Sequence, residues 1–196
     1  MTKFDWPLMS NNINQNDKKA LIKFIKTSDK FTNGEKVKIF EKKWSEWLGV
    51  KYSTFVNSGA SANLITLKIL KEIKKNKNEV IVPAFTWNSD IVSIINSGFK
   101  PIFVDIKLNN LALDEEKVKR KITKKTAAIF LTHAMGFVGI SKNFIKFIKK
   151  RKIFLIEDAC ESHGSNLNGK KSGTLGEISN FSFYYSHHMS TIEGGM

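Results

Sequence analysis

Residues 181–196 read FSFYYSHHMSTIEGGM, an apolar and aromatic run that passes into a pair of histidines and a polar turn. The run over residues 181–185 is typical of a strand that is buried in a sheet. A buried strand that delivers His187 and His188 to a loop can place a proton-transfer group beside a substrate, because loops on a rigid scaffold often carry functional side chains. This stretch therefore predicts both a sheet strand and the chemistry at its end.

Outward from that stretch, short apolar segments alternate with segments of helical periodicity. Gly49 and Asp114 stand where a C-terminal cap and an N-terminal cap of two such helices belong. Almost continuously apolar strands that alternate with helices are typical of a mostly parallel sheet covered by helices on both faces, so the sequence predicts an α/β fold. The predicted strands are residues 52–56, 79–82, 101–105, 127–132, 153–156 and 181–185, and the predicted helices are residues 13–27, 35–48, 60–74, 88–96, 115–122 and 142–150.

Several polar or aromatic residues fall just after these predicted strands. In open parallel sheets, ligands bind outside the carboxyl ends of the strands. We therefore expect one edge of the sheet to gather Ser58-Gly59, Trp87, His133, Asp158 and His187.

The net charge of +14 raises the question of nucleic-acid binding. Only Arg120 and Arg151 are arginines among the 32 basic residues, although arginine is the preferred side chain for bidentate phosphate and base contacts. The lysines are scattered through predicted helices and turns. This pattern indicates a lysine-rich solvated surface and no nucleic-acid site, with a weak general attraction for anionic substrates.

Cys160 is the single cysteine of the 196 residues, so it has no partner for an internal disulfide. A single cysteine favours a reducing compartment. The N-terminal residues MTKFDWPLMSNN contain no apolar signal region, and no apolar run is long enough to span a bilayer. We therefore expect a cytoplasmic protein that does not enter a membrane.

The motifs of the final stretch resemble a known signature. Ser182-Phe183, His187 and Glu193-Gly194-Gly195 are similar to the SFxxxK…GEGG pattern of the DegT/DnrJ/EryC1/StrS sugar aminotransferases. In that family the residue that matches His187 is a lysine, which forms a Schiff base with pyridoxal phosphate. The same exchange of lysine for histidine marks the sugar 3-dehydratase branch of the family. The resemblance implies an aspartate-aminotransferase-like large domain, the fold of type I pyridoxal-phosphate transferases.

Residues 57–62, NSGASA, join a predicted strand to a predicted helix. Small residues let the backbone approach an anion closely, and a helix N-terminus supplies free N–H groups, but a tight turn that only caps the helix explains the pattern equally well. The segment is similar to the SGTAAL segment of the family, which holds the cofactor phosphate. That match implies phosphate binding by Gly59, Ala60 and Ser61, with a hydroxyl added by Ser182.

The resemblance also implies which residues hold the cofactor ring. Trp87 ends a PAFTW segment whose last aromatic residue stacks on the pyridine ring in the family, although packing in the core is the alternative. Asp158 matches the aspartate that pairs with the protonated ring nitrogen, so that the ring can act as an electron sink. Glu161 stands where most aminotransferases of the family have glutamine near the ring hydroxyl. We expect a structural role for Glu157. For His133 we expect a structural role or a supporting role behind the site, with direct catalysis as the alternative.

Histidine in place of lysine changes the expected chemistry. Imidazole moves protons near neutral pH but cannot form the Schiff base, so the resemblance implies a non-covalent pyridoxal or pyridoxamine phosphate. His187 would remove a proton from C4′ of the cofactor. The implied reaction is loss of the 3-hydroxyl of a nucleotide-linked 4-keto-6-deoxyhexose in the biosynthesis of deoxysugars and O-antigen polysaccharides. We expect no metal site, because the spacing of His163, His187, His188 and Glu193 matches no usual zinc pattern.

Several alternatives stay open. Glutamate would regenerate the amine in one dehydratase type, and a reductase with an iron–sulfur cluster would do so in the other. An ordinary nucleotide-sugar aminotransferase and a non-catalytic truncated fragment are the competing functions. The resemblance implies a homodimer and an N-terminal fragment, in which residues 1–30 form an arm and helix, residues 31–196 form part of the large domain, and the C-terminal small domain is absent.

Overall fold

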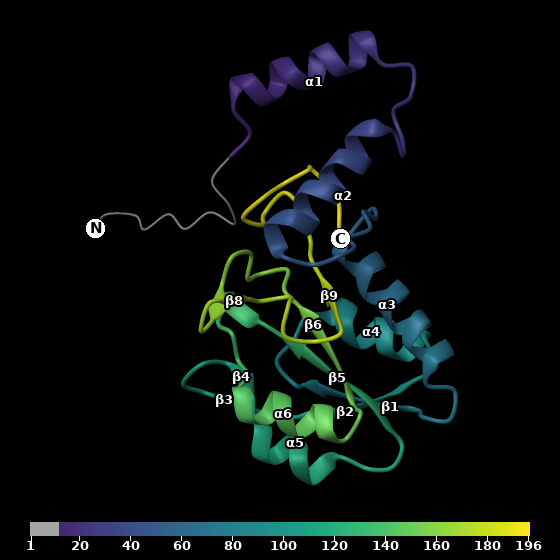
Figure 1. Ribbon diagram of the computed structural model, residues 1–196, viewed down its shortest axis with the longest axis vertical. Helices are drawn as coiled ribbons and strands as arrows, with labels where there is room; N and C mark the ends of the chain where they lie inside the picture. The colour runs from purple at the N-terminus through teal and green to yellow at the C-terminus, as the bar shows by residue number, and fades with distance from the viewer. Residues whose placement is uncertain (1–11) are drawn as a thin grey trace, which may run out of the picture.

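The computed structural model describes residues 12–196 and is built around a parallel sheet of five strands, in the order β2-β1-β5-β6-β9 (Figure 1). The first 11 residues of the predicted arm lie outside the described part of the chain. The strands of the central sheet are β1 (Glu79–Pro83), β2 (Lys100–Val104), β5 (Thr126–Thr132), β6 (Phe154–Asp158) and β9 (Ile178–Asn180). Two antiparallel pairs stand apart from it, β3 (Ile106–Lys107) with β4 (Ala112–Leu113) and β7 (Asn166–Leu167) with β8 (Lys170–Lys171).

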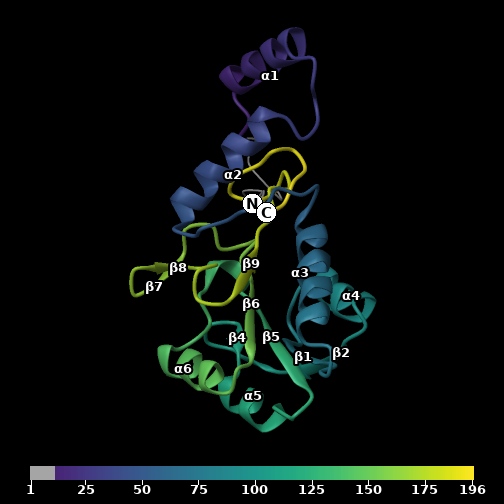
Figure 2. The ribbon, with the colours of Figure 1, turned by 45° about the vertical axis from the view of Figure 1, so that its right-hand side comes forward.

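Helices cover both faces of the sheet, which confirms the predicted α/β fold (Figure 2). Three of the predicted helices match the observed bounds to the residue, and the others differ by one or two positions. None of the helices in residues 12–196 has the length and apolarity needed to cross a membrane. The helices are α1 (Gln15–Thr27), α2 (Glu35–Leu48), α3 (Gly59–Ile73), α4 (Asn88–Asn96), α5 (Glu115–Lys121) and α6 (Lys142–Lys150), with a short 3-10 turn at Ala134–Gly136.

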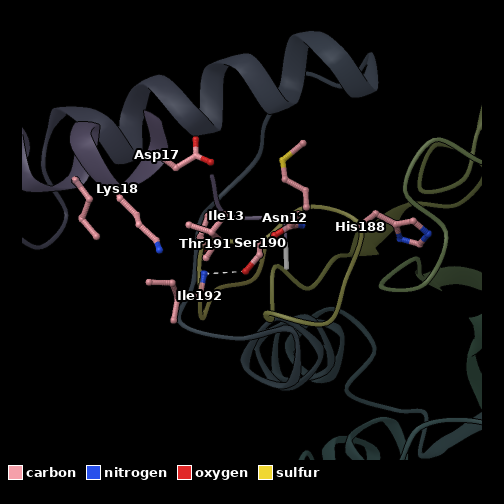
Figure 3. Close-up of a pocket in the computed structure, with 10 residues that line it drawn as sticks. Asn12, Ile13, Asp17, Lys18, His188, Ser190, Thr191 and Ile192 are labelled. Carbon is pink, nitrogen blue, oxygen red and sulfur yellow. Dashed lines mark hydrogen bonds between the residues drawn. The ribbon is translucent and has the colours of Figure 1, made fainter. Parts of the chain in front are cut away.

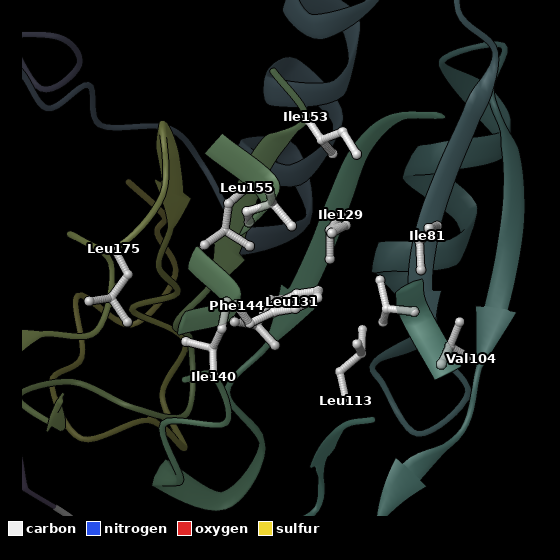
Figure 4. Close-up of a cluster of buried hydrophobic side chains, with 12 residues drawn as sticks. Ile81, Val104, Leu113, Ile129, Leu131, Ile140, Phe144, Ile153, Leu155 and Leu175 are labelled. Carbon is white, nitrogen blue, oxygen red and sulfur yellow. The ribbon is translucent and has the colours of Figure 1, made fainter. Parts of the chain in front are cut away.

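The alternation of side chains along each strand divides the core into two layers. In β5, Ile129 and Leu131 pack into the cluster beneath α5 and α6 (Figure 4), whereas Phe130 packs into the cluster beneath α3 and α4. Successive strand residues point to opposite faces, so a strand that is apolar throughout fills both layers. Both faces of the sheet are therefore buried, and its carboxyl edge remains as the place for a site.

A third apolar cluster attaches α2 to the end of the chain. Trp44 and Leu48 of α2 pack with Phe181, Phe183 and Met196. The Trp44 ring lies 5.0 Å from that of Phe181 and 4.8 Å from that of Phe183, measured between ring centroids. Gly49 ends α2 with a left-handed φ of 86°, as predicted. This cluster holds the segment that carries the histidines against the body of the domain.

Two predicted strands are wrong. Residues 52–56 form only one isolated bridge, between Val56 and Gly195, and residues 181–185 form only the bridge between Ser182 and Gly195. Both segments pair antiparallel with the returning end of the chain, outside the parallel sheet. The observed edge strand β9 lies immediately before residue 181, and its short polar sequence, Ile178-Ser179-Asn180, carries no apolar strand signal.

α1 follows its predicted pattern locally but buries none of its residues. Asn14 caps it, and the side chain of Asp17 accepts a hydrogen bond from the Asn14 N–H in return. Leu21 and Ile25, which belong to its predicted apolar face, are about half exposed.

Glu157 of β6 is fully buried and ties the loop after β8 to the sheet. One carboxylate oxygen accepts the N–H groups of Leu175 and Gly176, each at 2.7 Å. The other lies 2.8 Å from the Gly173 nitrogen and 2.8 Å from His133 Nε2. These contacts give Glu157 the structural role expected from the sequence, and they show His133 turned toward Glu157 behind the end of the sheet.

We predict that Glu157→Gln destabilises the protein by about 2–4 kcal/mol, because the amide turns an N–H group toward buried donors. Urea or thermal unfolding measures the effect. Glu177→Gln is the matched control: Glu177 is exposed and accepts the Leu155 N–H at 2.6 Å, a bond that the amide oxygen retains. This control should cost less than about 1 kcal/mol. Equal losses in the two variants would contradict the structural role of Glu157.

Candidate active site at the carboxyl edge of the sheet

Asp158, the last residue of β6, is the buried carboxylate of the site and is 5% exposed. Its Oδ1 accepts the Cys160 N–H at 2.9 Å, and its Oδ2 accepts an N–H of the Asn63 side chain at 3.1 Å. A carboxylate this buried stays ionised only when it has hydrogen bonds and an opposite charge nearby. The position suits a residue that pairs with a positively charged group of a ligand.

Asn63 and Asp90 extend this site, and neither was predicted from the sequence. Asn63 donates its second N–H to Asp90 Oδ1 at 2.8 Å. Asp90 is fully buried. Burial raises the pKa of Asp90 well above its usual value, and the nearby charge of Asp158 raises it further. The signal available in the sequence was the polar Asn63 within the apolar stripe of its helix, whereas Asp90 looked like an ordinary acid in a first helical turn.

The N-terminus of α3 forms a narrow cradle. A side chain at Gly59 would come within 2.8 Å of the Ser182 Cβ and 3.1 Å of the Cys160 sulfur, so the chain segments approach closely only because residue 59 is glycine. Within residues 12–196 the N–H groups of Gly59 and Ala60 meet no acceptor. The Ser61 N–H is already used by the capping hydroxyl of Ser58, at 3.1 Å. Free amides at a helix start suit an anion.

Trp87 immediately precedes α4 and leaves a flat aromatic face at the same edge of the sheet. It lies four residues beyond β1, and its side chain is 69% exposed. Packing in the core, the alternative considered for Trp87, is therefore wrong. An exposed indole offers a stacking surface to a planar ligand.

His187 lies in the turn that follows residues 181–183, with its backbone N–H bonded to the Tyr184 carbonyl at 3.0 Å. Burial lowers the pKa of His187 below its usual value, while the charges of Glu161 and then Asp158 oppose that effect. His187 is therefore close enough to both carboxylates to be influenced by their charges. Glu161 is held by a hydrogen bond from the Met135 N–H at 2.7 Å. A neutral imidazole beside carboxylates is suited to proton transfer.

His163 is a further histidine that the sequence did not assign to this site. Its ring lies 5.5 Å from that of His188 and 6.3 Å from that of His187, and it packs on Phe181 at 5.6 Å. Burial lowers the pKa of His163 to about 4, and the two neighbouring histidines lower it in the same direction. Among residues 12–196, no group of three or more His, Cys, Asp or Glu side chains is arranged to hold a metal ion.

A cavity of about 520 Å³ lies between the start of α1 and the loop after His187 (Figure 3). The Ile192 N–H bonds to the Ser190 hydroxyl at 2.9 Å and shapes the wall of this loop. The cavity is separate from Asp158 and Trp87. Its lining consists of Asn12, Ile13, Asp17, Lys18, Leu21, His188, Met189, Ser190, Thr191 and Ile192.

The parallel sheet, the cradle at the start of α3 and the buried acid after β6 define an aspartate-aminotransferase-like large domain. The chain belongs to the DegT/DnrJ/EryC1/StrS aminotransferase family, which matches residues 12–196.

Known relatives in the family include enzymes of nucleotide-sugar metabolism. The chain is 40% identical to GDP-4-keto-6-deoxy-D-mannose 3-dehydratase of Yersinia pseudotuberculosis over 97% of this chain and 49% of that protein. It is 33% identical to GDP-perosamine synthase of Vibrio cholerae over 97% of this chain and 51% of that protein. The chain therefore spans about half the length of the curated relatives that it matches.

Solved structures show the same relationship. The E. coli GDP-4-keto-6-deoxy-D-mannose-3-dehydratase with bound hydrated PLP superimposes with a TM-score of 0.90 at 37% identity, over 97% of this chain and 50% of that chain. A GDP-4-keto-6-deoxymannose-3-dehydratase with a trapped PLP-glutamate geminal diamine also gives a TM-score of 0.90, at 36% identity over 97% of this chain and 50% of that chain.

We predict that His163 makes the protein sensitive to acid. Between pH 6.5 and about 4 the unfolded chain binds a proton at His163 and the folded chain does not. The free energy of unfolding therefore decreases as the pH is lowered through that window. The loss from this group is about 2 kcal/mol at pH 5. His163→Phe should therefore lose less stability than the wild type between pH 7.5 and pH 5 in thermal unfolding. Equal acid losses would contradict the pKa shift of His163.

Proposed function

We propose that this chain carries the cofactor site of a nucleotide-sugar 3-dehydratase that uses pyridoxal and pyridoxamine phosphate. The observation that carries the proposal is His187, a half-buried imidazole beside Asp158 and Glu161 at the position where the family has its Schiff-base lysine. Relatives named as 3-dehydratases, at 40% and 37% identity, support it.

The residues at the carboxyl edge fit this cofactor. Gly59 leaves a cradle that any side chain would fill, and the N–H groups of Gly59 and Ala60, which have no acceptor among residues 12–196, can meet a phosphate. Trp87 presents an exposed ring for stacking. The Asn63 side-chain oxygen is buried without a hydrogen-bond partner among residues 12–196, and the amide nitrogen of the same side chain bonds to Asp158. The residues proposed to bind the phosphate, the ring face and the ring nitrogen therefore lie at one edge of the sheet.

Each residue has a separate task in this proposal. Gly59, Ala60 and Ser61 bind the phosphate with help from Ser182, although the Ser61 N–H already serves the cap of α3, which leaves its hydroxyl for the ligand. Asp158 keeps a positive charge on the pyridine nitrogen, and Trp87 holds the ring face. Glu161 lies near His187 and fills the position close to the ring hydroxyl. When bound, the cofactor supplies an electron sink for carbon–oxygen bond cleavage next to a keto group.

His187 is the proton-transfer group. Its lowered pKa leaves the imidazole neutral at pH 7, ready to accept a proton. It lacks the primary amine needed to attach the cofactor covalently, so binding depends on the phosphate cradle, Trp87 and Asp158. A proton held on His187 can then be returned when the 3-hydroxyl leaves as water.

The proposed substrate is a GDP-linked 4-keto-6-deoxyhexose, and the proposed amino donor is glutamate. A relative solved with bound GDP-perosamine and another with a trapped PLP-glutamate geminal diamine support both choices over regeneration through an iron–sulfur reductase. The positive charge of the chain would attract an anionic nucleotide sugar. A homodimer in the cytoplasm completes the proposal; the single cysteine supports a reducing compartment.

A nucleotide-sugar aminotransferase is the second candidate. It is supported by relatives named as GDP-perosamine synthases, at 33% and 36% identity. That reaction in the family depends on the lysine that this chain replaces with His187, and it therefore ranks below the dehydratase. A truncated fragment without catalysis is the third candidate, and binding of pyridoxamine phosphate by the 196-residue chain would count against it.

The direct test uses the whole protein with pyridoxamine phosphate, glutamate and GDP-4-keto-6-deoxymannose, followed by mass spectrometry of the sugar. We expect a 3-deoxy product. A 4-amino product would establish the aminotransferase instead.

His187→Ala should lower kcat by about 10²- to 10⁴-fold while cofactor affinity changes little, because the histidine moves protons and does not anchor the cofactor.

The pH dependence of the reaction gives an independent prediction for Glu161. His187 must be neutral to accept a proton, so kcat/KM should fall on the acid side at a pH below 6.5. The Glu161 charge favours the protonated imidazole, and Glu161→Gln should therefore move this acid limb to still lower pH. Glu177→Gln removes an exposed carboxylate elsewhere and should leave the limb in place. A shift to higher pH in Glu161→Gln would contradict the proposed effect of the Glu161 charge on His187.

A further inference from the structure

Two buried carboxyl groups, Asp90 and Asp158, share one amide. Asn63 donates one N–H to Asp90 Oδ1 at 2.8 Å and the other to Asp158 Oδ2 at 3.1 Å. Asn63 is 1% exposed and Asp90 is fully buried, so water does not screen the pair. Because both acceptors are carboxyl oxygens, the amide nitrogen must face them, and the orientation of Asn63 is determined. The two acids are therefore coupled through a single rigid donor.

The second oxygen of Asp90 belongs to a closed triangle with two hydroxyls. Thr132 Oγ1 lies 3.1 Å from Asp90 Oδ2 and 2.5 Å from Thr86 Oγ1, and Thr86 Oγ1 also bonds to Asp90 Oδ2. Three oxygen–oxygen hydrogen bonds require three protons, and the two hydroxyls supply only two. The third proton is present if Asp90 is a neutral acid. The triangle then closes with one donated and one accepted bond at each oxygen.

The surrounding charges favour that proton. The titratable groups that face Asp90 are Asp158 at the end of β6 and Cys160 just after it. Burial raises the pKa of the Cys160 thiol, so Cys160 brings no positive charge. In residues 12–196, no Lys, Arg or His side chain forms an ion pair with either aspartate. Two unpaired buried carboxylates joined by one amide would repel each other strongly, and one of them must be neutral.

We propose that Asp90 is a positioning residue for Asp158: as a neutral acid it holds Asn63 in place, so that Asn63 orients Asp158 and Asp158 carries the single negative charge of the pair. This proposal rests on the proposed function for the role of Asp158 toward a ring nitrogen. In this proposal Asp90 and Asn63 keep the negative charge on the carboxylate of Asp158, the group that would meet the ligand.

The protonation of Asp90 can be tested without cofactor. Infrared spectra of the whole apoprotein, labelled with ¹³C at the aspartate side-chain carboxyl, should show a protonated-carboxyl C=O band at pH 7.5. Asp90→Asn should lack this band and Asp158→Asn should retain it. A band that persists in Asp90→Asn, or no band in the wild type, would overturn the proposal.

The positioning role needs a readout at the ring nitrogen. Pyridoxamine phosphate labelled with ¹⁵N in the ring is bound to the whole protein, and its ¹⁵N chemical shift reports protonation of that nitrogen. Wild type should show the protonated nitrogen. Asp90→Ala frees Asn63 and should weaken cofactor binding by about tenfold and move the ¹⁵N signal toward the unprotonated form. Asp90→Asn preserves the neutral hydrogen bonds. It should bring the cofactor affinity back to within about threefold of wild type and return the ¹⁵N signal to the wild-type chemical shift.

Thr66→Val is the matched control for a purely structural loss. Thr66 lies on the same helix as Asn63, is also buried and donates its hydroxyl to Asn180 Oδ1 at 2.7 Å, with no hydrogen bond to Asp158 or Asp90. It should lower the unfolding temperature without moving the ¹⁵N signal. An unchanged ¹⁵N signal in Asp90→Ala would overturn the positioning role. Failure of the wild type to bind pyridoxamine phosphate would instead overturn the proposed function, and the infrared band would still decide the state of Asp90.

Discussion

One buried negative charge at the end of β6 is the constraint on which the rest of the site depends. Asp158 is buried at the end of a parallel strand, and a buried carboxylate requires hydrogen bonds on its oxygens and a positive partner. The Cys160 amide and the Asn63 side chain supply the hydrogen bonds. The positive partner has to come from a ligand, because no cation in the described residues reaches it. The fold therefore leaves Asp158 in need of a positively charged partner, and a protonated heterocycle could fill that role.

Close backbone approach is the second constraint, and it joins distant parts of the chain around that charge. Val56 and Gly195 exchange two backbone hydrogen bonds, of 2.9 and 2.8 Å, which return the end of the chain to the start of α3. A side chain at Gly195 would come within 2.3 Å of the Ser58 carbonyl oxygen. The loop that carries His187 is thus secured at both ends, by this bridge and by the aromatic cluster around Trp44.

The fold was predictable from the sequence because most strands of the central sheet are mainly apolar and several helices carry clear caps, as Asp114 and Gly49 show. Residues 181–185 and 52–56 have the composition of strands but pair only in isolated bridges. Strand β9 is too short and polar to be predicted from its sequence. The residues at the carboxyl edge were predictable because parallel strands place their ends together. The Asn63 contacts were not, since they join residues 27 and 95 positions apart in the chain.

Histidine at position 187 gives this arrangement its direction. A lysine at position 187 would bring a positive charge toward Asp158 and Glu161, whereas a half-buried imidazole with a lowered pKa stays neutral. Among residues 12–196 the carboxylate of Asp158 then has no ion-paired cation, and the ring nitrogen of the proposed cofactor would be its partner. In the proposed function His187 offers no covalent attachment, so the affinity for the cofactor would come from the cradle at Gly59, the exposed face of Trp87 and that single charge. Precise placement of Asp158 by its buried neighbours consequently matters more here than in a site that tethers its cofactor.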